Sequence, residues 1–343
     1  MSTTSELRRD GGASASGTTL AQKLIARAAG KAHVNVGEVL TCQVDLAMFH
    51  DSSGPRRLKP MLADIGAEIW DKNKVVLVLD HYVPARDADA EKIIRITRDV
   101  AKEWQLPHVI DSEGICHVVL PERGHLKPGY FCVGGDSHSP TGGAFGTYMF
   151  GIGATEMLGV VATGEIWVQV PQTLRMVWHG ELQKGVCAKD MMLHMIGKFG
   201  MNGGNYQAVE FAGDTVRRLV MQERMTLSNM SAEMGAQVGL IAADSTTRDY
   251  SYALDEIAQS EISSSDLANL ECDHLASLAR AIRSRVLRAA LYAAGAPSGS
   301  ITADHLAAVE ALVTSWHGQG VVSLPGGVKV ERISGRLSLL AQP

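Results

Sequence analysis

The chain has 343 residues, of which 45% are hydrophobic and 20% charged, and its formal net charge is −5. This length is enough for a large core and suggests two domains, or one domain with an extension. No basic stripe indicates nucleic-acid binding, and the longest uncharged stretch, 137–155, is too rich in glycine and polar residues for a membrane span.

The cysteines give a first indication of the compartment. An odd number at irregular spacing, with no C-x-x-C pair, indicates reduced thiols, so we expect a cytoplasmic protein and leave a mitochondrial location open. The five residues are Cys42, Cys116, Cys132, Cys187 and Cys272. Residues 1–18 are rich in Ser, Thr and Gly and lack an apolar signal core, which predicts a flexible tail.

The early part of the chain alternates predicted helices and strands. Thr19 is a suitable N-cap for a helix over 20–29, and the segment 34–39 follows it. Residues 75–79 form a continuous apolar run typical of a strand buried on both faces, and the apolar spacing over 90–104 predicts an amphipathic helix. A strand followed by a helix is the βα unit of a parallel sheet, so we expect an α/β fold.

Polar residues gather near residue 50. His50, Asp51 and Ser52 lie together just before Pro55. They either contact a polar ligand or, in the case of Asp51 and Ser52, only cap the segment that follows. The residues alone leave both interpretations open.

Acids and histidines recur at the ends of apolar runs. Asp80 and His81 come directly after 75–79, and His117 follows the next short run. A carboxylate beside an imidazole fixes its tautomer and raises its basicity, as proton transfer requires. An isolated histidine among apolar neighbours, such as His117, is more often a structural residue.

The segment 134–143 is the most informative part of the chain. The apolar run 130–133 predicts a buried strand, and the glycines that follow allow a sharp turn. Asp136, Ser137 and His138 then stand at the strand's end, where open α/β sheets place ligand crevices. The alternative is a tight turn in which Asp and Ser only bond local backbone.

The chain continues with further alternating elements. They are a helix over 153–164, a strand over 173–178, a helix over 189–197 and a strand over 209–211. A helix over 224–236 then places Asn229 and Glu233 four residues apart on one face. These two side chains either make a buried polar contact or lie on a solvated surface.

Four ordered motifs together resemble the aconitase superfamily, and within it the large subunit of 3-isopropylmalate dehydratase and homoaconitase. They are the segments 80–81, 114–117, 135–146 and 228–236, and the resemblance covers about 19–250. It implies stacked α/β/α domains around a deep cleft. It also implies the dehydration and rehydration of a hydroxy di- or tricarboxylate.

The resemblance also implies roles for individual residues. The carboxylate–histidine pairs match acid–base groups near the leaving hydroxyl. The serine matches a group that binds a substrate carboxylate, and the last motif matches polar groups near the cluster and water. The catalytic residues we expect are Asp80, His81, His117, Asp136, His138 and Glu233. With the group near residue 50 added, the substrate-binding residues we expect are His50, Ser52, Ser137 and Asn229.

The cofactor pattern departs from this family. Its [4Fe–4S] cluster is held by cysteines in a Ser-Cys-Thr-Asn type motif and a downstream C-x-x-C, and neither motif is present here. We therefore expect no metal-ligating residues, and either no cofactor or a loosely bound divalent metal. The family's serine base usually lies on a separate small subunit, so we expect a small-molecule carboxylate and a small subunit as partners, without nucleic acid or membrane.

The composition changes between about 255 and 274. Residues 274–343 hold 7 Lys and Arg against 3 Asp and Glu, a net charge of +4. Because the whole chain has a net charge of −5, the first 273 residues have a net charge of −9. Arginines lie opposite an apolar stripe over 275–291, where they either bind substrate or face solvent. We expect a flexible tail over 1–18, aconitase-like α/β/α domains over 19–255, and a divergent, mainly helical tail over 256–343.

Two functions remain after the sequence analysis. The first is a lyase or isomerase of this family, which without a cluster would carry out double-bond or cis–trans isomerisation. The second is an inactive or truncated paralogue that binds carboxylates or a partner subunit.

Overall fold

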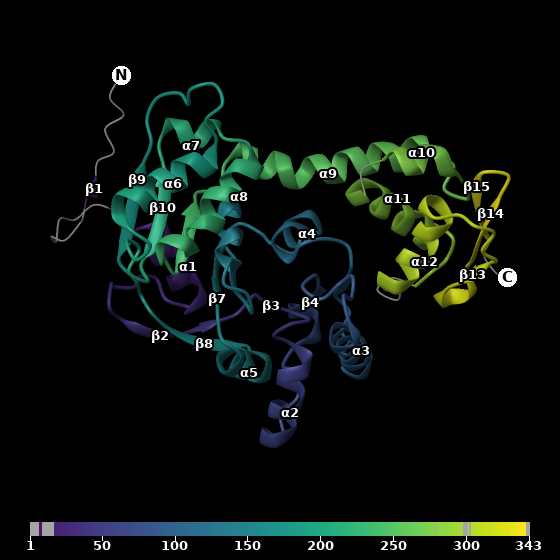
Figure 1. Cartoon of the computed structure of the whole chain (residues 1–343), viewed down its shortest axis with the longest axis horizontal. Helices are drawn as coiled ribbons and strands as arrows, with labels where there is room; N and C mark the ends of the chain where they lie inside the picture. Colours follow the sequence, from purple (N-terminus) through teal and green to yellow (C-terminus); the bar gives the residue numbers. More distant parts are fainter. Residues whose placement is uncertain (1–6, 9–16, 279, 298–300, 302, 341–343) are drawn as a thin grey trace. The chain divides into compact units, whose positions relative to one another are not determined.

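The computed structural model describes residues 7–8, 17–278, 280–297, 301 and 303–340 (Figure 1). The chain divides into two compact units. Unit 1 consists of Met1–Leu106 and Ser112–Arg248, and unit 2 of Pro107–Asp111 and Asp249–Pro343. Most of the tail expected over 1–18 lies outside the described residues.

The first layer of unit 1 contains a parallel run of strands in the order β4-β3-β6-β7. Their bounds are β3 (Leu46–His50), β4 (Val75–Leu79), β6 (Phe131–Gly134) and β7 (Tyr148–Gly151). Every residue of β3, β4 and β6 is buried, which explains their continuous apolar sequence. Because β4 and β6 pair with opposite edges of β3, the carboxyl ends of these strands form a topological switch point, where such sheets place their ligands.

Helices cover this sheet, and α2 packs against both α3 and α5 (Figure 1). The helices of this layer are α1 (Leu20–Ala28), α2 (Pro55–Ile65), α3 (Ala88–Glu103), α4 (Cys116–Glu122) and α5 (Ala154–Thr163). Thr19 caps α1 as predicted, since its side chain accepts a hydrogen bond from Gln22 N.

Strand β2 (Val39–Gln43) begins at the end of the segment 34–39, and it pairs antiparallel with β8 (Glu165–Gln169). Gly37, at φ +86°, turns the chain just before β2, so the apolar residues upstream do not extend the strand.

A second layer of unit 1 repeats the α/β pattern. Strands β9 (Thr173–Val177), β10 (Ala208–Ala212) and β11 (Val238–Ile241) are parallel, and β1 (Leu7–Arg8) pairs antiparallel with β9. The helices of this layer are α6 (Ala188–Phe199), α7 (Asp214–Arg218) and α8 (Met221–Met230), followed by the 3₁₀ helix η3 (Ala232–Met234). The helix predicted over 224–236 is therefore divided in two. The predicted α/β fold class is confirmed.

The 3₁₀ helix η2 (Ser139–Phe145) joins the two layers. It follows the glycine turn after β6 and packs against α8, β7 and β11. A β-carbon at Gly143 would overlap the carbonyl oxygen of Gly239 in β11, so the close contact requires glycine there. The approach brings α8 and η3 to the carboxyl end of β6.

Unit 2 has its own apolar core and more strand than the sequence predicted. Its helices are α9 (Ser245–Ser264), α10 (Cys272–Ser277), α11 (Arg280–Ala293) and α12 (Ala303–Thr314). Its antiparallel sheet has the order β12-β15-β14-β13, with β12 (Asn269–Glu271), β13 (Val322–Ser323), β14 (Lys329–Ile333) and β15 (Arg336–Leu340). The short strand β5 (Val109–Asp111) also falls in unit 2. The mainly helical tail expected over 256–343 therefore omitted a four-stranded sheet.

No helix in the described part of the chain is long and apolar enough to cross a membrane.

Candidate active site

Three neighbouring strands of the first layer end in the polar residues that the sequence singled out. His50 is the last residue of β3, Asp80 and His81 follow β4, and Asp136 follows β6. Because parallel strands end at the same edge of a sheet, these side chains meet although up to 86 residues separate them in sequence.

Asp136 is the centre of the group. Its Oδ1 accepts a hydrogen bond from the backbone N–H of His138 at 2.7 Å and lies 2.9 Å from His117 Nε2. Its Oδ2 lies 3.4 Å from His81 Nε2 and 3.7 Å from His50 Nε2. Burial raises the pKa of this carboxyl, but the bonds from His117 and His138 and the nearby imidazoles outweigh burial and hold the pKa well below its ordinary value. Asp136 is therefore an anion that gathers three imidazoles.

His81 is held by carboxylates on both edges of its ring. Its Nδ1 donates to Asp80 Oδ1 at 2.6 Å, and its Nε2 faces Asp136. Burial lowers the pKa of His81, but the bond to Asp80 and the charges of Asp80, Asp136 and Asp51 raise it above its ordinary value. The ring is partly exposed, so it is a proton donor within reach of a ligand.

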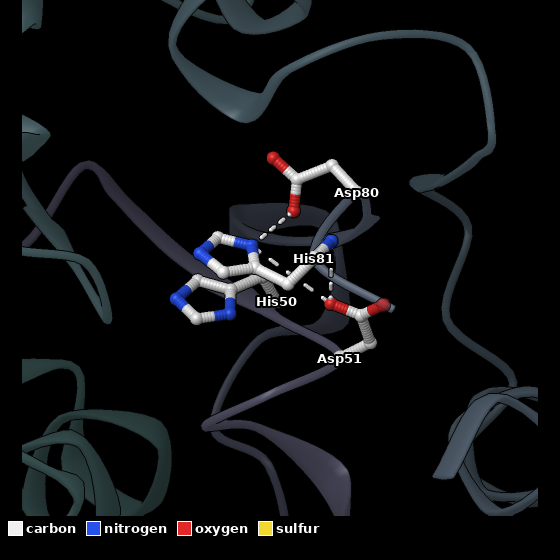
Figure 2. Close-up of side chains that lie close together, drawn as sticks. All are labelled: His50, Asp51, Asp80 and His81. Carbon is white, nitrogen blue, oxygen red and sulfur yellow. Dashed lines mark hydrogen bonds and ion pairs between the residues drawn. The ribbon is translucent and has the colours of Figure 1, made fainter. Parts of the chain in front are cut away.

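His50 lies under His81, and its pKa shifts in the opposite direction. The two rings stack with centroids 3.9 Å apart and planes inclined by 7° (Figure 2). Nε2 of His50 donates to the carbonyl of Gly135 at 3.0 Å, and Ser52 Oγ lies 2.9 Å from its Nδ1. Burial and the neighbouring His81 lower the pKa of His50, so its neutral form is favoured.

His117 reaches the site from the first turn of helix α4, not from a strand. The sequence pattern treated this apolar segment as strand-like, but Asp80 Oδ2 accepts a hydrogen bond from the backbone N–H of Cys116 and satisfies a free donor at the helix start. Asp80 thus contacts His81 with one oxygen and supports the segment of His117 with the other.

His138 and Glu233 form the outer part of the site. Nε2 of His138 donates to Glu233 Oε1 at 2.9 Å, and Ser137 Oγ lies 3.1 Å from His138 Nδ1. The Glu233 side chain is 50% exposed, so water reaches this pair far more than the group around Asp136. Ser137 is exposed at the end of the turn.

Two expected substrate-binding residues are occupied by internal contacts. The amide nitrogen of Asn229 donates to Thr141 Oγ1 at 2.9 Å and ties α8 to η2. His50 is 3% exposed, which leaves little of its ring for a ligand.

Asp51 belongs to the same group and was not among the expected site residues. It is fully buried, and the sequence offered only a cap as its alternative role. Its oxygens accept hydrogen bonds from the backbone N–H groups of His81 and Tyr82, at 3.1 and 2.9 Å. Its place directly after an apolar strand was the available signal.

Ligand atoms of His50, Asp51, Asp80 and His81 lie within 4.8 Å of one another, which raises the question of a metal ion (Figure 2). Imidazole lone pairs lie in the ring plane, so the stacked rings direct them along nearly parallel lines. A cation about 2.0–2.1 Å from each nitrogen cannot lie in both planes. Since Asp51 is also occupied by backbone N–H groups, the arrangement suits a shared proton better than a metal.

The cysteines do not fit an iron–sulfur cluster. In the part of the chain that the structure describes, no group of cysteines lies close enough to hold a metal. Cys116 is the one near the site, and burial with the charges of Asp80 and Asp136 raises its pKa. Burial also raises the pKa of Cys42 to about 11. A cluster needs thiolate ligands, so these residues do not provide its site.

Comparison with protein families gives two matches. The family described as aconitase family (aconitate hydratase) matches residues 22–277, and the TilS substrate binding domain matches residues 270–338. The second match covers most of unit 2, which the sequence analysis treated as divergent.

Curated relatives match the first part of the chain. A probable 3-isopropylmalate dehydratase large subunit of Methanothermobacter thermautotrophicus is 43% identical over 233 residues, 68% of this chain and 56% of the relative. A probable methanogen homoaconitase large subunit of the same organism is 43% identical over 236 residues, 67% of this chain and 55% of the relative. The chain spans about half the length of these relatives.

A solved structure, that of Thermococcus kodakaraensis aconitase X in its holo-form, aligns with a TM-score of 0.35 and 9% identity over 59% of this chain and 52% of that chain. This likeness is too low to support an argument.

Proposed function

The chain belongs to the aconitase family, and we propose that it acts as a lyase or isomerase on a small hydroxy di- or tricarboxylate or its unsaturated acid. The observation that supports this proposal is the convergence of His50, His81 and His117 on the Asp136 carboxylate. Imidazoles oriented by carboxylates are the groups that general acid–base catalysis uses.

In this proposal His81 is the general acid. It transfers its Nε2 proton to the substrate hydroxyl while a base of the proposed small subunit removes the proton from the adjacent carbon, so that the C–O and C–H bonds break, a C=C bond forms and water leaves. The Asp80 carboxylate holds Nδ1 and stabilises the charged ring before the transfer. His117 keeps the Asp136 carboxylate in place through its Nε2 contact.

The outer residues receive the substrate. The exposed hydroxyl of Ser137 provides a hydrogen-bond donor for a carboxylate, and Nδ1 of His138 beside it accepts from a hydroxyl group. Glu233 fixes the tautomer of His138, since a carboxylate accepts only from a protonated Nε2. The orienting roles of Asn229 and Ser52 follow from their contacts with Thr141 and His50.

The finer proposal is double-bond or cis–trans isomerisation of the unsaturated acid. Moving a proton between carbon atoms needs a paired acid and base and no thiolate-bound cluster. The residues described above form such pairs, whereas the cysteines do not assemble a cluster site. No step of this proposal passes through a cluster or a metal ion.

Proton exchange tests the proposal directly. The purified full chain is incubated in D₂O with isopropylmalate, homocitrate, citrate or their unsaturated acids, and ¹H NMR follows deuterium uptake and isomer formation. We expect exchange with at least one acid, and its loss in His81→Gln. His194→Gln changes an exposed histidine on α6 and is the matched control. No exchange with any acid, alone or with a 3-isopropylmalate dehydratase small subunit, would contradict the proposal.

A second candidate is a non-catalytic protein that binds carboxylates or a partner subunit. It is favoured by the separated cysteines. The relatives are named large subunits, so a small subunit is the proposed partner. Calorimetry with the same acids and co-purification with that subunit, in the absence of exchange, would support this candidate.

A further inference from the structure

We propose that Asp51 is a positioning residue that fixes the ring of His81 and favours its protonation. The sequence left two roles open for Asp51, a contact to a polar ligand and a local cap. The inference rests on the proposed function only in taking His81 as the proton donor.

The Asp51 carboxylate is buried, and both of its oxygens accept hydrogen bonds. The side chain is 0% exposed, and its two oxygens accept hydrogen bonds from His81 N at 3.1 Å and Tyr82 N at 2.9 Å. A buried carboxylate that binds two consecutive backbone N–H groups fixes the turn they belong to. That turn is the one that presents His81 at the end of β4.

The two carboxylates near His81 also determine which way its ring nitrogens point. Figure 2 shows the Asp80 and Asp51 carboxylates on the Nδ1 side of the His81 ring. Asp80 Oδ1 lies 2.6 Å from Nδ1, and Asp51 Oδ1 lies 3.9 Å from it. With both anions on this edge, Nε2 is left to face Asp136.

The charges around the ring also affect its protonation. The groups that face His81 are His50 from β3, Asp51 after β3, Asp80 after β4 and Asp136 after β6. Burial of the His81 ring lowers its pKa, whereas the three carboxylates raise it. Asp51 therefore helps to offset the cost of burying a charged ring.

The experiment is an NMR titration of the imidazole of His81 in the full chain without substrate. In Asp51→Asn we expect the midpoint of His81 to fall by about one pH unit, the low end of what an opposite charge within 4–6 Å contributes. Asp51→Ser, a smaller neutral acceptor, replaces it where the Asn variant does not fold, and should give the same fall.

Asp45→Asn is the matched control. Asp45 stands just before β3, at the opposite end from Asp51, and it also accepts a backbone hydrogen bond, from Phe131 N at 2.8 Å. It should lower stability without moving the His81 midpoint. An unchanged midpoint in both neutral Asp51 variants, or an equal shift in Asp45→Asn, would overturn the positioning role.

The titration also separates this inference from the proposed function. It uses no substrate, so a fall in the midpoint supports the role of Asp51 even where no turnover is found. Where turnover exists, the pH profile of kcat should shift to lower pH with the midpoint while KM stays near the parent value, a split that lost folding alone would not produce.

Discussion

Unit 1 and unit 2 each place a largely buried carboxylate beside basic side chains, but of different kinds. In unit 1 the partners are the histidines around Asp136, and in unit 2 Arg283 is the partner of Glu310. Arg283 donates to Glu310 Oε1 from Nε at 2.9 Å and from Nη2 at 2.7 Å, and the side chains are only 11% and 10% exposed. A guanidinium stays protonated throughout the ordinary pH range, whereas an imidazole gains and loses its proton near neutrality. Similar burial therefore gives a fixed structural contact in unit 2 and a group able to exchange protons in unit 1.

Arg283 in the C-terminal stripe does not lie on a solvated face, since its side chain is 11% exposed. Its Nη1 donates to the carbonyl of Leu278 at 2.9 Å in addition to the bonds to Glu310. Its contacts hold α11 to α12 and to the end of α10.

The largest expected effect comes from removing His81, the histidine that we propose as the proton donor. His81→Gln keeps hydrogen-bonding groups but cannot carry a positive charge. We expect turnover of any acid that exchanges with the parent chain to fall by about 100- to 10,000-fold, the usual range for a general acid. Steady-state kinetics measures the effect, and an unchanged kcat would show that His81 is not the donor.

The next largest effect is expected from breaking the Arg283–Glu310 pair of unit 2. Glu310→Ala leaves the charge of Arg283 without its partner, and we expect the free energy of unfolding to fall by about 3–5 kcal/mol. Urea unfolding of the full chain, followed by circular dichroism, measures it. The double variant Arg283→Met with Glu310→Leu should recover part of the loss, because it removes both charges.

Equal losses in the single and double Arg283–Glu310 variants would show that packing, not charge, dominates at this contact. The His81 titration should stay unchanged in both variants. A coupled change there would contradict the separation of fixed and exchangeable charge.

A smaller effect is expected at the exposed part of the histidine group, the pair of His138 and Glu233. Glu233 is half exposed, and water screens its bond to His138 more than the bonds around Asp136. We expect Glu233→Gln to lower kcat by no more than about tenfold, with Glu156→Gln on α5 as the control. A loss as large as that of His81→Gln would place Glu233 at the reacting atoms.

The smallest expected effect is on the pH dependence of stability. The pKa of Asp136 is lower in the folded chain than its ordinary value of about 4, so its stabilisation is present above that value and is lost as the pH falls through the folded pKa. The melting temperature should decrease below about pH 4, and Asp136→Asn should flatten this decrease. Differential scanning calorimetry across pH 2–6 measures the slope, and an equally steep slope in the variant would contradict the role of Asp136.

The sequence predicted the positions of the site better than its contacts. Asp80, His81 and Asp136 follow apolar runs, and apolar runs of this kind form parallel strands whose ends meet. The roles of Asp51 and His117 were beyond such reasoning. Asp51 bonds a turn 30 residues away, and the first turn of α4 depends on Asp80, 36 residues before it.

The sequence by itself determined the α/β class, the cap at Thr19 and the strand ends that carry acids and histidines, because these depend on local periodicity and on neighbouring residues. Only the tertiary structure decided the directions in which the pKa values of His50 and His81 shift, since the stack of His50 on His81 and the carboxylates that face it come from three strands. Burial and Coulomb interaction depend on distance in space, and chain order alone does not supply that distance.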